Sequence, residues 1–301
     1  MSADTVRPDA AAPDTVTPDP GIVAAGPRRR RPGATLVVGA VLVGTVVLMA
    51  LVSFVWTPYD PTFVDASARL RPIGDPAHLL GTDKLGRDVL SQLLVGARTT
   101  LFVGVVAVGV AGLVGVPLGL VAAMATRWLG ETLMRGMDLL LAFPALLLAI
   151  MFGAVYGGST LVAMVAIGIA SVPSFVRLVR GGSLQVLGTE YVLAARAAGR
   201  RPWSIGLRHV LPNVSGLVIV QASVSFAIAV LAEAALSFLG YGTPPPTPSW
   251  GRMLQESQEL LYAAPRLAFV PGIAIAVAVL GFNLLGDGLR DHFDPRLEDR
   301  R

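Results

Sequence analysis

Six long apolar stretches, each near the length that crosses a lipid bilayer, constrain this chain more than any other feature. A hydrocarbon core about 30 Å thick needs roughly 20 apolar residues in a helix that rises about 1.5 Å per residue. The stretches are Ala34–Trp56, Leu101–Ala125, Met137–Tyr156, Leu161–Val176, Leu217–Leu239 and Leu267–Leu285. Hydrophobic residues make up 53% of the chain and charged residues only 15%, a balance that is rare in soluble domains. The sequence therefore predicts an all-α membrane protein with six transmembrane helices.

The distribution of basic residues predicts the orientation of these helices. Basic residues concentrate in the cytoplasmic segments of membrane proteins. If the N-terminus is cytoplasmic, 17 of the 24 lysine and arginine residues fall on the inner side. The outer side then holds Arg69, Arg71, Lys84, Arg87, Arg98, Arg252 and Arg266. We therefore expect a multi-pass protein of the bacterial cytoplasmic membrane with both termini in the cytoplasm.

The composition also divides the chain into segments. Residues 1–33 repeat Pro-Asp pairs among alanine and threonine and end near a run of four arginines, Arg28 to Arg31, so they predict a disordered cytoplasmic tail. Residues 34–98 then form the first transmembrane helix and an external loop. Residues 99–296 form a core of five transmembrane helices, and residues 297–301 form a short cytoplasmic tail.

Several classes of site are excluded or disfavoured by what the chain contains. Cysteine does not occur, so disulfides, thiolate metal sites and cysteine nucleophiles are excluded. Lys84 is the only lysine and stands in TDKLG, so the chain has no phosphate-binding loop for ATP. The histidines, His78, His209 and His292, lack metal-ligand spacing, and no catalytic triad is recognisable. We therefore expect neither an enzyme nor a metal site.

The segment from Thr189 to Asn213 is polar and lies between two apolar stretches. Thr189 to Ala198 has a helical pattern, Gly199 predicts a stop, and Pro202 is suited to the first turn of a second helix that ends near Pro212. A DNA-binding helix-turn-helix is disfavoured because it would be tethered between two spans. A loop packed on its own spans remains open. The favoured hypothesis is a protein-docking element, since small alanines permit close approach and arginines pair with carboxylates.

The same segment resembles a known family. Ala194-Ala195-x-x-x-Gly199, followed by His209-x-Leu211-Pro212, is similar to the EAA loop of binding-protein-dependent ABC importer permeases. Leu193 replaces the usual glutamate of that loop, and His209 stands where isoleucine is common. Three further segments resemble the C-type permeases of the dipeptide, oligopeptide and nickel branch, namely Gly81 to Leu101, Leu231 to Leu254 and Phe282 to Arg296.

The resemblance implies a type I ABC importer permease fold with a cytoplasmic coupling helix and no catalysis by this chain. It implies a second permease chain, two ATPase subunits that carry ATP and magnesium, and a solute-binding protein that delivers short peptides or a related small solute. The residues expected to couple to the ATPase are Glu190, Ala194, Ala195, Arg196, Gly199, Pro202, His209 and Pro212.

Polar residues within the apolar stretches leave one alternative open. Glu233, Gln221 and Asn283 fall in or near predicted spans and have either pathway or packing roles. A proton-coupled secondary transporter or a channel would use such groups as relays. In the outer loops, Trp250 and Tyr262 are expected at headgroup depth, where they serve as interfacial anchors or contribute to a binding-protein surface.

Overall fold

The computed structural model describes residues 33–157 and 159–293, which belong to one compact unit. Throughout these residues the regular structure is helical, apart from an isolated β-bridge between Thr82 and Asp88. The expected tails fall outside this description, except for Gly33. Five helices are long and apolar enough to cross a membrane. They are α1 (Ala34–Val55), α2 (Val89–Met124), α5 (Thr160–Leu187), α8 (Leu211–Phe238, continuous with the preceding turns from Pro202) and α10 (Arg266–Phe293).

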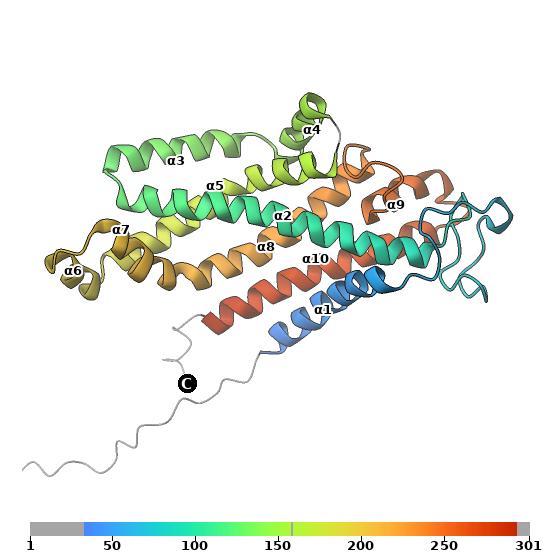
Figure 1. Cartoon of the computed structure of the whole chain (residues 1–301), viewed down its shortest axis with the longest axis horizontal. Helices are drawn as coiled ribbons and strands as arrows, with labels where there is room; N and C mark the ends of the chain where they lie inside the picture. Colours follow the sequence, from blue (N-terminus) through green and yellow to red (C-terminus); the bar gives the residue numbers. More distant parts are fainter. Residues whose placement is uncertain (1–32, 158, 294–301) are drawn as a thin grey trace, which may run out of the picture. The chain divides into compact units, whose positions relative to one another are not determined.

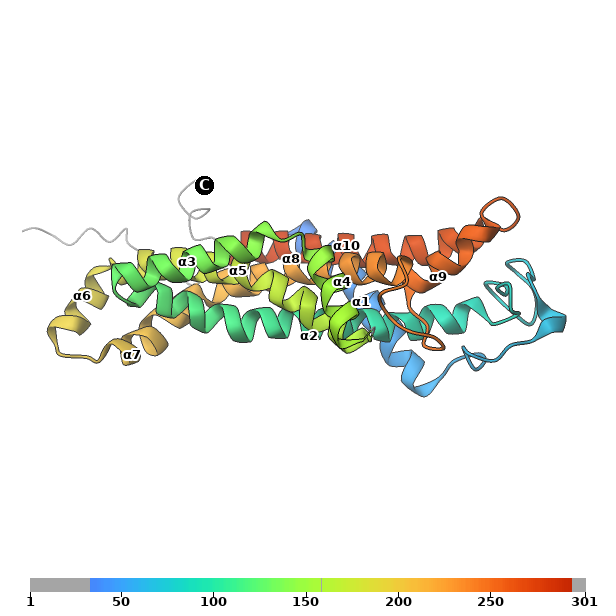
Figure 2. The same ribbon diagram turned by 90° about the horizontal axis from the view of Figure 1, so that it is seen from above.

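The long helices run roughly side by side; α2, α5 and α10 share one direction, and α1 and α8 run the opposite way (Figures 1 and 2). One end of the bundle carries the short helices α6 (Glu190–Ala197) and α7 (Pro202–Ile205), and the start of α1 and the end of α10 face this end. The opposite end carries residues 56–88 and α9 (Trp250–Ser257). The start of α1 and the end of α10 therefore lie toward the same end of the bundle, as expected for a chain that crosses the membrane an even number of times.

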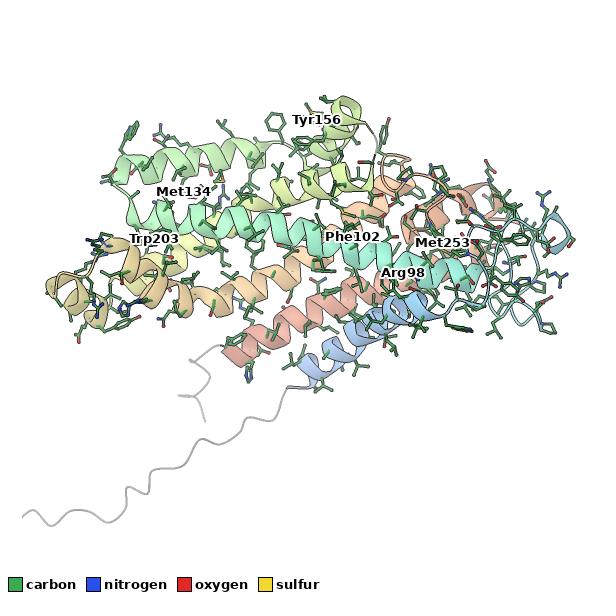
Figure 3. The ribbon with its side chains drawn as sticks, viewed as in Figure 1. Arg98, Phe102, Met134, Tyr156, Trp203 and Met253 are labelled. Carbon is green, nitrogen blue, oxygen red and sulfur yellow. The ribbon has the colours of Figure 1, made fainter. Side chains whose placement is uncertain are left out.

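Close packing between α2 and α5 depends on glycine. A Cβ atom at Gly115 would lie 2.5 Å from Cβ of Phe175, and one at Gly119 would lie 2.8 Å from the carbonyl oxygen of Val176. Many other apolar side chains point outward, as in Figure 3, where Phe102 and Tyr156 are labelled; they are 57% and 70% exposed. An apolar outer surface is what a lipid environment favours.

The third predicted span, Met137–Tyr156, is broken at its proline. The structure has α3 (Arg127–Ala142) and α4 (Ala145–Tyr156), which are bent by 82° at the break between them. Proline lacks an N–H and disfavours the helical conformation of the residue before it. Phe143 is accordingly extended, with φ −84° and ψ 126°, and Pro144 then starts α4. The pair is one broken span or a re-entrant segment.

The ends of three other helices also differ from prediction. α2 begins at Val89 rather than near Leu101, α5 continues to Leu187 rather than ending near Val176, and α10 continues to Phe293 rather than ending near Leu285. The Asp88 side chain caps α2 by accepting from the Ser91 N–H at 2.8 Å.

Candidate functional site

The segment that joins α5 to α8 forms a compact projection from one end of the bundle. Helix α6 covers Glu190–Ala197, within the range predicted for it. Val192 is its buried residue, with no exposed surface. Val192 packs in a cluster with Leu120 of α2, Val179 and Leu187 of α5, and Ile205, Val210 and Val214. One apolar side chain thus seats α6 on the ends of two long helices.

Gly199 reverses the chain between α6 and α7. Its φ of +75° lies in the left-handed region that residues with a Cβ atom rarely adopt. The reversal closes the end of α6, because the Gly199 N–H donates to the Arg196 carbonyl at 2.9 Å and the Arg200 N–H donates to the Ala195 carbonyl at 3.1 Å. Pro202 then occupies the first turn of α7, as its sequence position predicts.

Helix α6 presents a continuous exposed face. Glu190, Leu193, Ala194 and Ala197 follow the spacing of one helical face, and all four are exposed. Leu193 is 50% exposed although it is a large apolar residue. Arg196 is exposed on a neighbouring face. Within residues 33–157 and 159–293, neither Glu190 nor Arg196 belongs to an ion pair, so both charges are available to another molecule.

The expected end of the second short helix at Pro212 was wrong. Residues Gly206–Val210 form a π-helical turn in which the Leu211 N–H bonds back to the Gly206 carbonyl, and the chain continues into α8 without a break. The wider turn admits the proline ring near the start of α8, where a missing N–H costs little. His209 is half-buried, and its ring meets that of Tyr191 edge-on at 6.2 Å between centroids. Helix α7 is therefore continuous with α8.

The predicted polar residues of the spans do not form one cluster. Gln221 Nε2 donates to Ser225 Oγ at 3.1 Å, and Asn283 Nδ2 donates to the Val279 carbonyl at 3.0 Å. Both bonds stay within one helix. Glu233 is only 2% exposed and bonds to hydroxyl groups near the opposite end of the bundle from α6.

Two ion-pair arrangements were missed by the sequence reasoning. Asp138 of α3 pairs with Arg177 of α5, rather than with Arg135 one turn earlier on its own helix. At the outer end, a buried chain of charges joins Asp83, Arg87, Glu256 and Arg252, with 2.6 Å between Arg87 Nε and Asp83 Oδ2. The i,i+4 spacing of Asp83 and Arg87 could have predicted their ion pair. Glu256 is far from both in the sequence, so its pair with Arg87 could not have been predicted.

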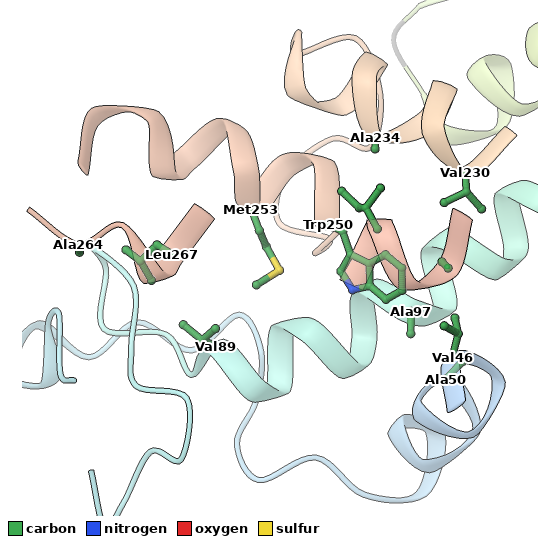
Figure 4. Close-up of a cluster of buried hydrophobic side chains, with 12 residues drawn as sticks. Val46, Ala50, Val89, Ala97, Val230, Ala234, Trp250, Met253, Ala264 and Leu267 are labelled. Atoms are coloured by element: carbon green, nitrogen blue, oxygen red, sulfur yellow. The ribbon is translucent and has the colours of Figure 1, made fainter. Parts of the chain in front are cut away.

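Trp250 is not exposed as an interfacial anchor would be, which corrects the expectation for it. Its side chain is fully buried between α2 and α8, as Figure 4 shows, and its Nε1–H donates to the Leu93 carbonyl at 3.0 Å. A Cβ atom at Gly96 would approach the Trp250 ring at 2.6 Å, so the tryptophan fills the space that this glycine leaves. Tyr262, in contrast, is fully exposed.

An open groove of about 620 Å³ lies between α2 and α8. It is lined by apolar or glycine residues, namely Val105, Val108, Gly109, Gly112, Leu113, Val116, Pro117, Val218 and Phe226. Peptide-like solutes carry polar backbone groups, and such a surface offers them no hydrogen bonds.

Comparisons with known proteins agree on one family. The model of the binding-protein-dependent transport system inner membrane component matches residues 115–299. A glutathione transport system permease protein, GsiD, of Pectobacterium atrosepticum is 41% identical, covering 86% of this chain and 87% of that protein. The dipeptide transport system permease protein DppC of Alkalihalophilus pseudofirmus is 40% identical, covering 87% of this chain and 86% of that protein. A di/tripeptide transport system permease protein DppC of Pseudomonas aeruginosa is 42% identical over 80% of this chain and 82% of its own length.

A solved structure supports the fold. A chain of the MetNI methionine ABC transporter, in inward-facing conformations, superposes with a TM-score of 0.57. The two chains are 18% identical, and the match covers 67% of this chain and 96% of that one. The fold is thus that of an ABC importer permease.

Proposed function

The chain belongs to the family of inner membrane components of binding-protein-dependent transport systems, and from this premise we propose that it conducts short peptides or a peptide-like solute such as glutathione. It is a multi-pass permease subunit of an ABC importer. The observation that carries the substrate proposal is the agreement among relatives about 40% identical over most of their length, named for dipeptides, di/tripeptides and glutathione. These compounds share peptide bonds and charged ends.

We propose that α6 is the helix that docks on a separate ATPase subunit. Its exposed face combines an apolar residue, Leu193, with the small residues Ala194 and Ala197, and it has a carboxylate at one end. A protruding leucine beside two alanines fits a shallow apolar cleft, because the alanines let the partner surface approach closely. Leu193 stands where the EAA loop usually has a glutamate, so the contact at this position would be apolar in place of ionic. Arg196, on the neighbouring face, is available to pair with a carboxylate of that subunit.

The same geometry supports α6 as a lever. The chain from Pro202 to Phe238 is one helix of 37 residues, so a displacement at the projection is carried along the length of α8. Val192 also ties α6 to the ends of α2 and α5. Closure of an ATPase pair would move these elements together and shift the bundle between inward-facing and outward-facing states.

We further propose that the assembled importer contains a second permease chain, two ATPase subunits that bind ATP and magnesium, and a solute-binding protein on the outer face. The sequence supports a separate ATPase because its only lysine, Lys84, stands outside any phosphate-binding motif. No observation among the described residues favours the proton-coupled alternative. Glu233, the carboxylate that such a mechanism would use, is enclosed by its neighbours.

Affinity purification of the tagged chain from its native membrane tests the docking proposal. We expect the wild-type chain to bring down an ATPase and a second permease chain. Leu193→Asp places a charge at the centre of the proposed contact and should reduce ATPase recovery at least about tenfold, since burial of an unpaired charge costs several kcal/mol. Arg196→Glu and Gly199→Pro should also abolish attachment or transport.

Trp203→Ala is the matched control, because Trp203 is 63% exposed on α7 rather than on the docking face of α6. It should retain the ATPase. Full recovery of the ATPase with Leu193→Asp, at normal expression, would remove α6 from the contact. Uptake of labelled dipeptide and labelled glutathione by cells that express the complete system then identifies the solute class. Failure to transport either would exclude the substrate proposal and leave the docking result standing.

A further inference from the structure

Helix α3 carries its charged residues along one face. At spacings of three or four residues it exposes Arg127, Glu131, Arg135 and Asp138. Arg127 Nε pairs with Glu131 Oε1 at 2.8 Å within the helix. Asp138 Oδ1 instead pairs with a guanidinium nitrogen of Arg177 on α5. This ion pair between helices turns the charged face of α3 toward Arg177.

Helix α5 has a polar stripe that contains Arg177. At spacings of three or four residues it exposes Ser174, Arg177, Gly181 and Gln185. A Cβ atom at Gly181 would have nothing within 4 Å, so the stripe is open at this point. Val179, which packs on α2, is buried on the opposite side of α5. The stripe and the charged face of α3 meet at the Arg177–Asp138 pair, and together we call them the α3–α5 face.

Arg177 lies at a level of the bundle where α2 is apolar. On either side of it in α5, Phe175 and Val179 pack on Gly115 and Gly119 of α2. The apolar stretch of α2 that was predicted as a span extends beyond both glycines in each direction and carries no charge. The ion pair therefore lies within the membrane-spanning part of the bundle.

The exposure of this ion pair is unusual for such a position. The Arg177 and Asp138 side chains are 48% and 58% exposed. Charged residues within membrane spans face water-filled cavities or the protein interior, because hydrocarbon does not solvate them. The cores of protein–protein interfaces are likewise depleted of charged residues. The groove between α2 and α8, by contrast, is lined only by apolar residues and glycine. The two surfaces differ as a water-filled face differs from one that suits lipid.

We propose that the α3–α5 face lines the aqueous path of the transported solute, and that Arg177 and Asp138 bind the charged ends of that solute. This inference rests on the proposed function, in which the solute is a short peptide or glutathione. Such a solute carries a carboxylate and an ammonium group. Arg177 can bind the carboxylate and Asp138 can bind the ammonium group through charge-assisted hydrogen bonds. A passing solute would exchange the Arg177–Asp138 pair for two pairs of its own, so that no charge is left unpaired within the span.

The first test measures whether water reaches Ser174. The chain has no cysteine, so Ser174→Cys introduces the only thiol in it. The complete importer, in membrane vesicles opened by freezing and thawing, is treated with a quaternary-ammonium methanethiosulfonate, and labelling is read on the tagged chain. This cationic reagent does not enter hydrocarbon. We expect Ser174→Cys to react at least about tenfold faster than the control Leu113→Cys.

Leu113 is a control at a similar depth in the bundle. It is 80% exposed on α2 and lies close in sequence to Gly115, which packs on Phe175 beside Ser174. It also lines the apolar groove rather than the α3–α5 face. Equal rates for the two thiols would overturn the proposal and assign the α3–α5 face to lipid or to a partner chain.

The second test measures protection by the solute. A saturating dipeptide should slow the labelling of Ser174→Cys at least about fivefold. The same dipeptide with an acetylated N-terminus and an amidated C-terminus has neither charge and should not slow it. Arg177→Gln, in the Ser174→Cys background, should raise the half-protecting dipeptide concentration about tenfold, because it removes a charge-assisted hydrogen bond. Lys84→Gln is the control, since it removes a cation that pairs with Glu259 at the other end of the bundle, and it should keep the wild-type protection.

Uptake of labelled dipeptide by cells that express the complete system separates this inference from the proposed function. Uptake without any protection of Ser174→Cys would overturn the assignment of Arg177 and Asp138 and leave the proposed substrate standing. Neither uptake nor protection would exclude the peptide substrate, and with it the binding of peptide ends. The comparison with Leu113→Cys would still decide whether the α3–α5 face is aqueous.

Discussion

Glycine residues of α2 have different structural roles, depending on whether they face another helix or the open groove. Gly119 lies against α5, where a Cβ atom would come within 2.8 Å of both the Val176 carbonyl oxygen and Cβ of Val179. Gly109 has nothing within 4 Å of the position of a Cβ atom, because it faces the open groove between α2 and α8. Both occur in the same apolar stretch, and the sequence does not distinguish them.

Substitution at these two positions should therefore have different effects on stability. Gly119→Val forces α2 and α5 apart, and overpacking of this kind costs about 1–3 kcal/mol. We expect a lower melting temperature of the purified protein for Gly119→Val and little change for Gly109→Ala. Equal losses would mean that the close packing of Gly119 on α5 is not what distinguishes the two sites.

At the scale of elements, the outer segment 56–88 is held to α9 and α10 by polar contacts. Arg87 is the centre of the buried charge chain, with 10% of its side chain exposed, and Arg266 donates to the Arg71 carbonyl at 2.7 Å. Lys84 pairs with Glu259 at 2.8 Å, but the Glu259 side chain is 74% exposed. Breaking a buried ion pair lowers the stability of a protein much more than breaking an exposed one does.

We expect Arg87→Met to loosen this segment far more than Lys84→Met does. Removing Arg87 leaves Asp83 without its cation and Glu256 with Arg252 alone. Breaking a buried pair in this way costs about 3–5 kcal/mol, whereas exposed pairs contribute about 0–1 kcal/mol. The measurement is the rate of tryptic cleavage after Arg69, which is exposed in this segment. Cleavage that is equally fast in both variants would show that the charge chain does not hold the segment in place.

Whether an element could be predicted from the sequence depends on how far apart in the sequence the interacting residues are. The long apolar stretches predicted the helices, because burial in lipid acts on every residue of a span. The break at Pro144 was readable as a kink, but its 82° angle depends on how α4 packs. The continuation through Pro212 was not predicted, because a π-helical turn accommodates a proline that a regular helix excludes. The Arg87–Glu256 contact joins residues that are remote in sequence, and no local pattern reveals it.

The candidate docking helix was more predictable than its surroundings. Thr189, Gly199 and Pro202 are local start and stop signals, and they placed α6 to within one residue at each end. Which face of α6 is exposed depends on Val192, whose burial requires the ends of α2 and α5.

At the scale of the whole molecule, the two ends of the bundle differ in what they offer. One end carries the projection α6–α7 with its exposed charges, and the other carries the braced outer segment and the exposed Tyr262. The excess of basic residues predicts that the α6 end faces the cytoplasm. This orientation is required by the proposed function, because the ATPase is a cytoplasmic protein in that arrangement.

The absence of cysteine from the chain makes the orientation directly measurable. Single substitutions Tyr262→Cys and Ala197→Cys place a thiol at an exposed position on each end. A membrane-impermeant maleimide applied to intact cells should label Tyr262→Cys and should leave Ala197→Cys unlabelled until the membrane is permeabilised. The unsubstituted chain is the control and should show no labelling. The reverse pattern would place α6 outside the cell, away from any source of ATP, and would contradict both the orientation and the docking role of α6.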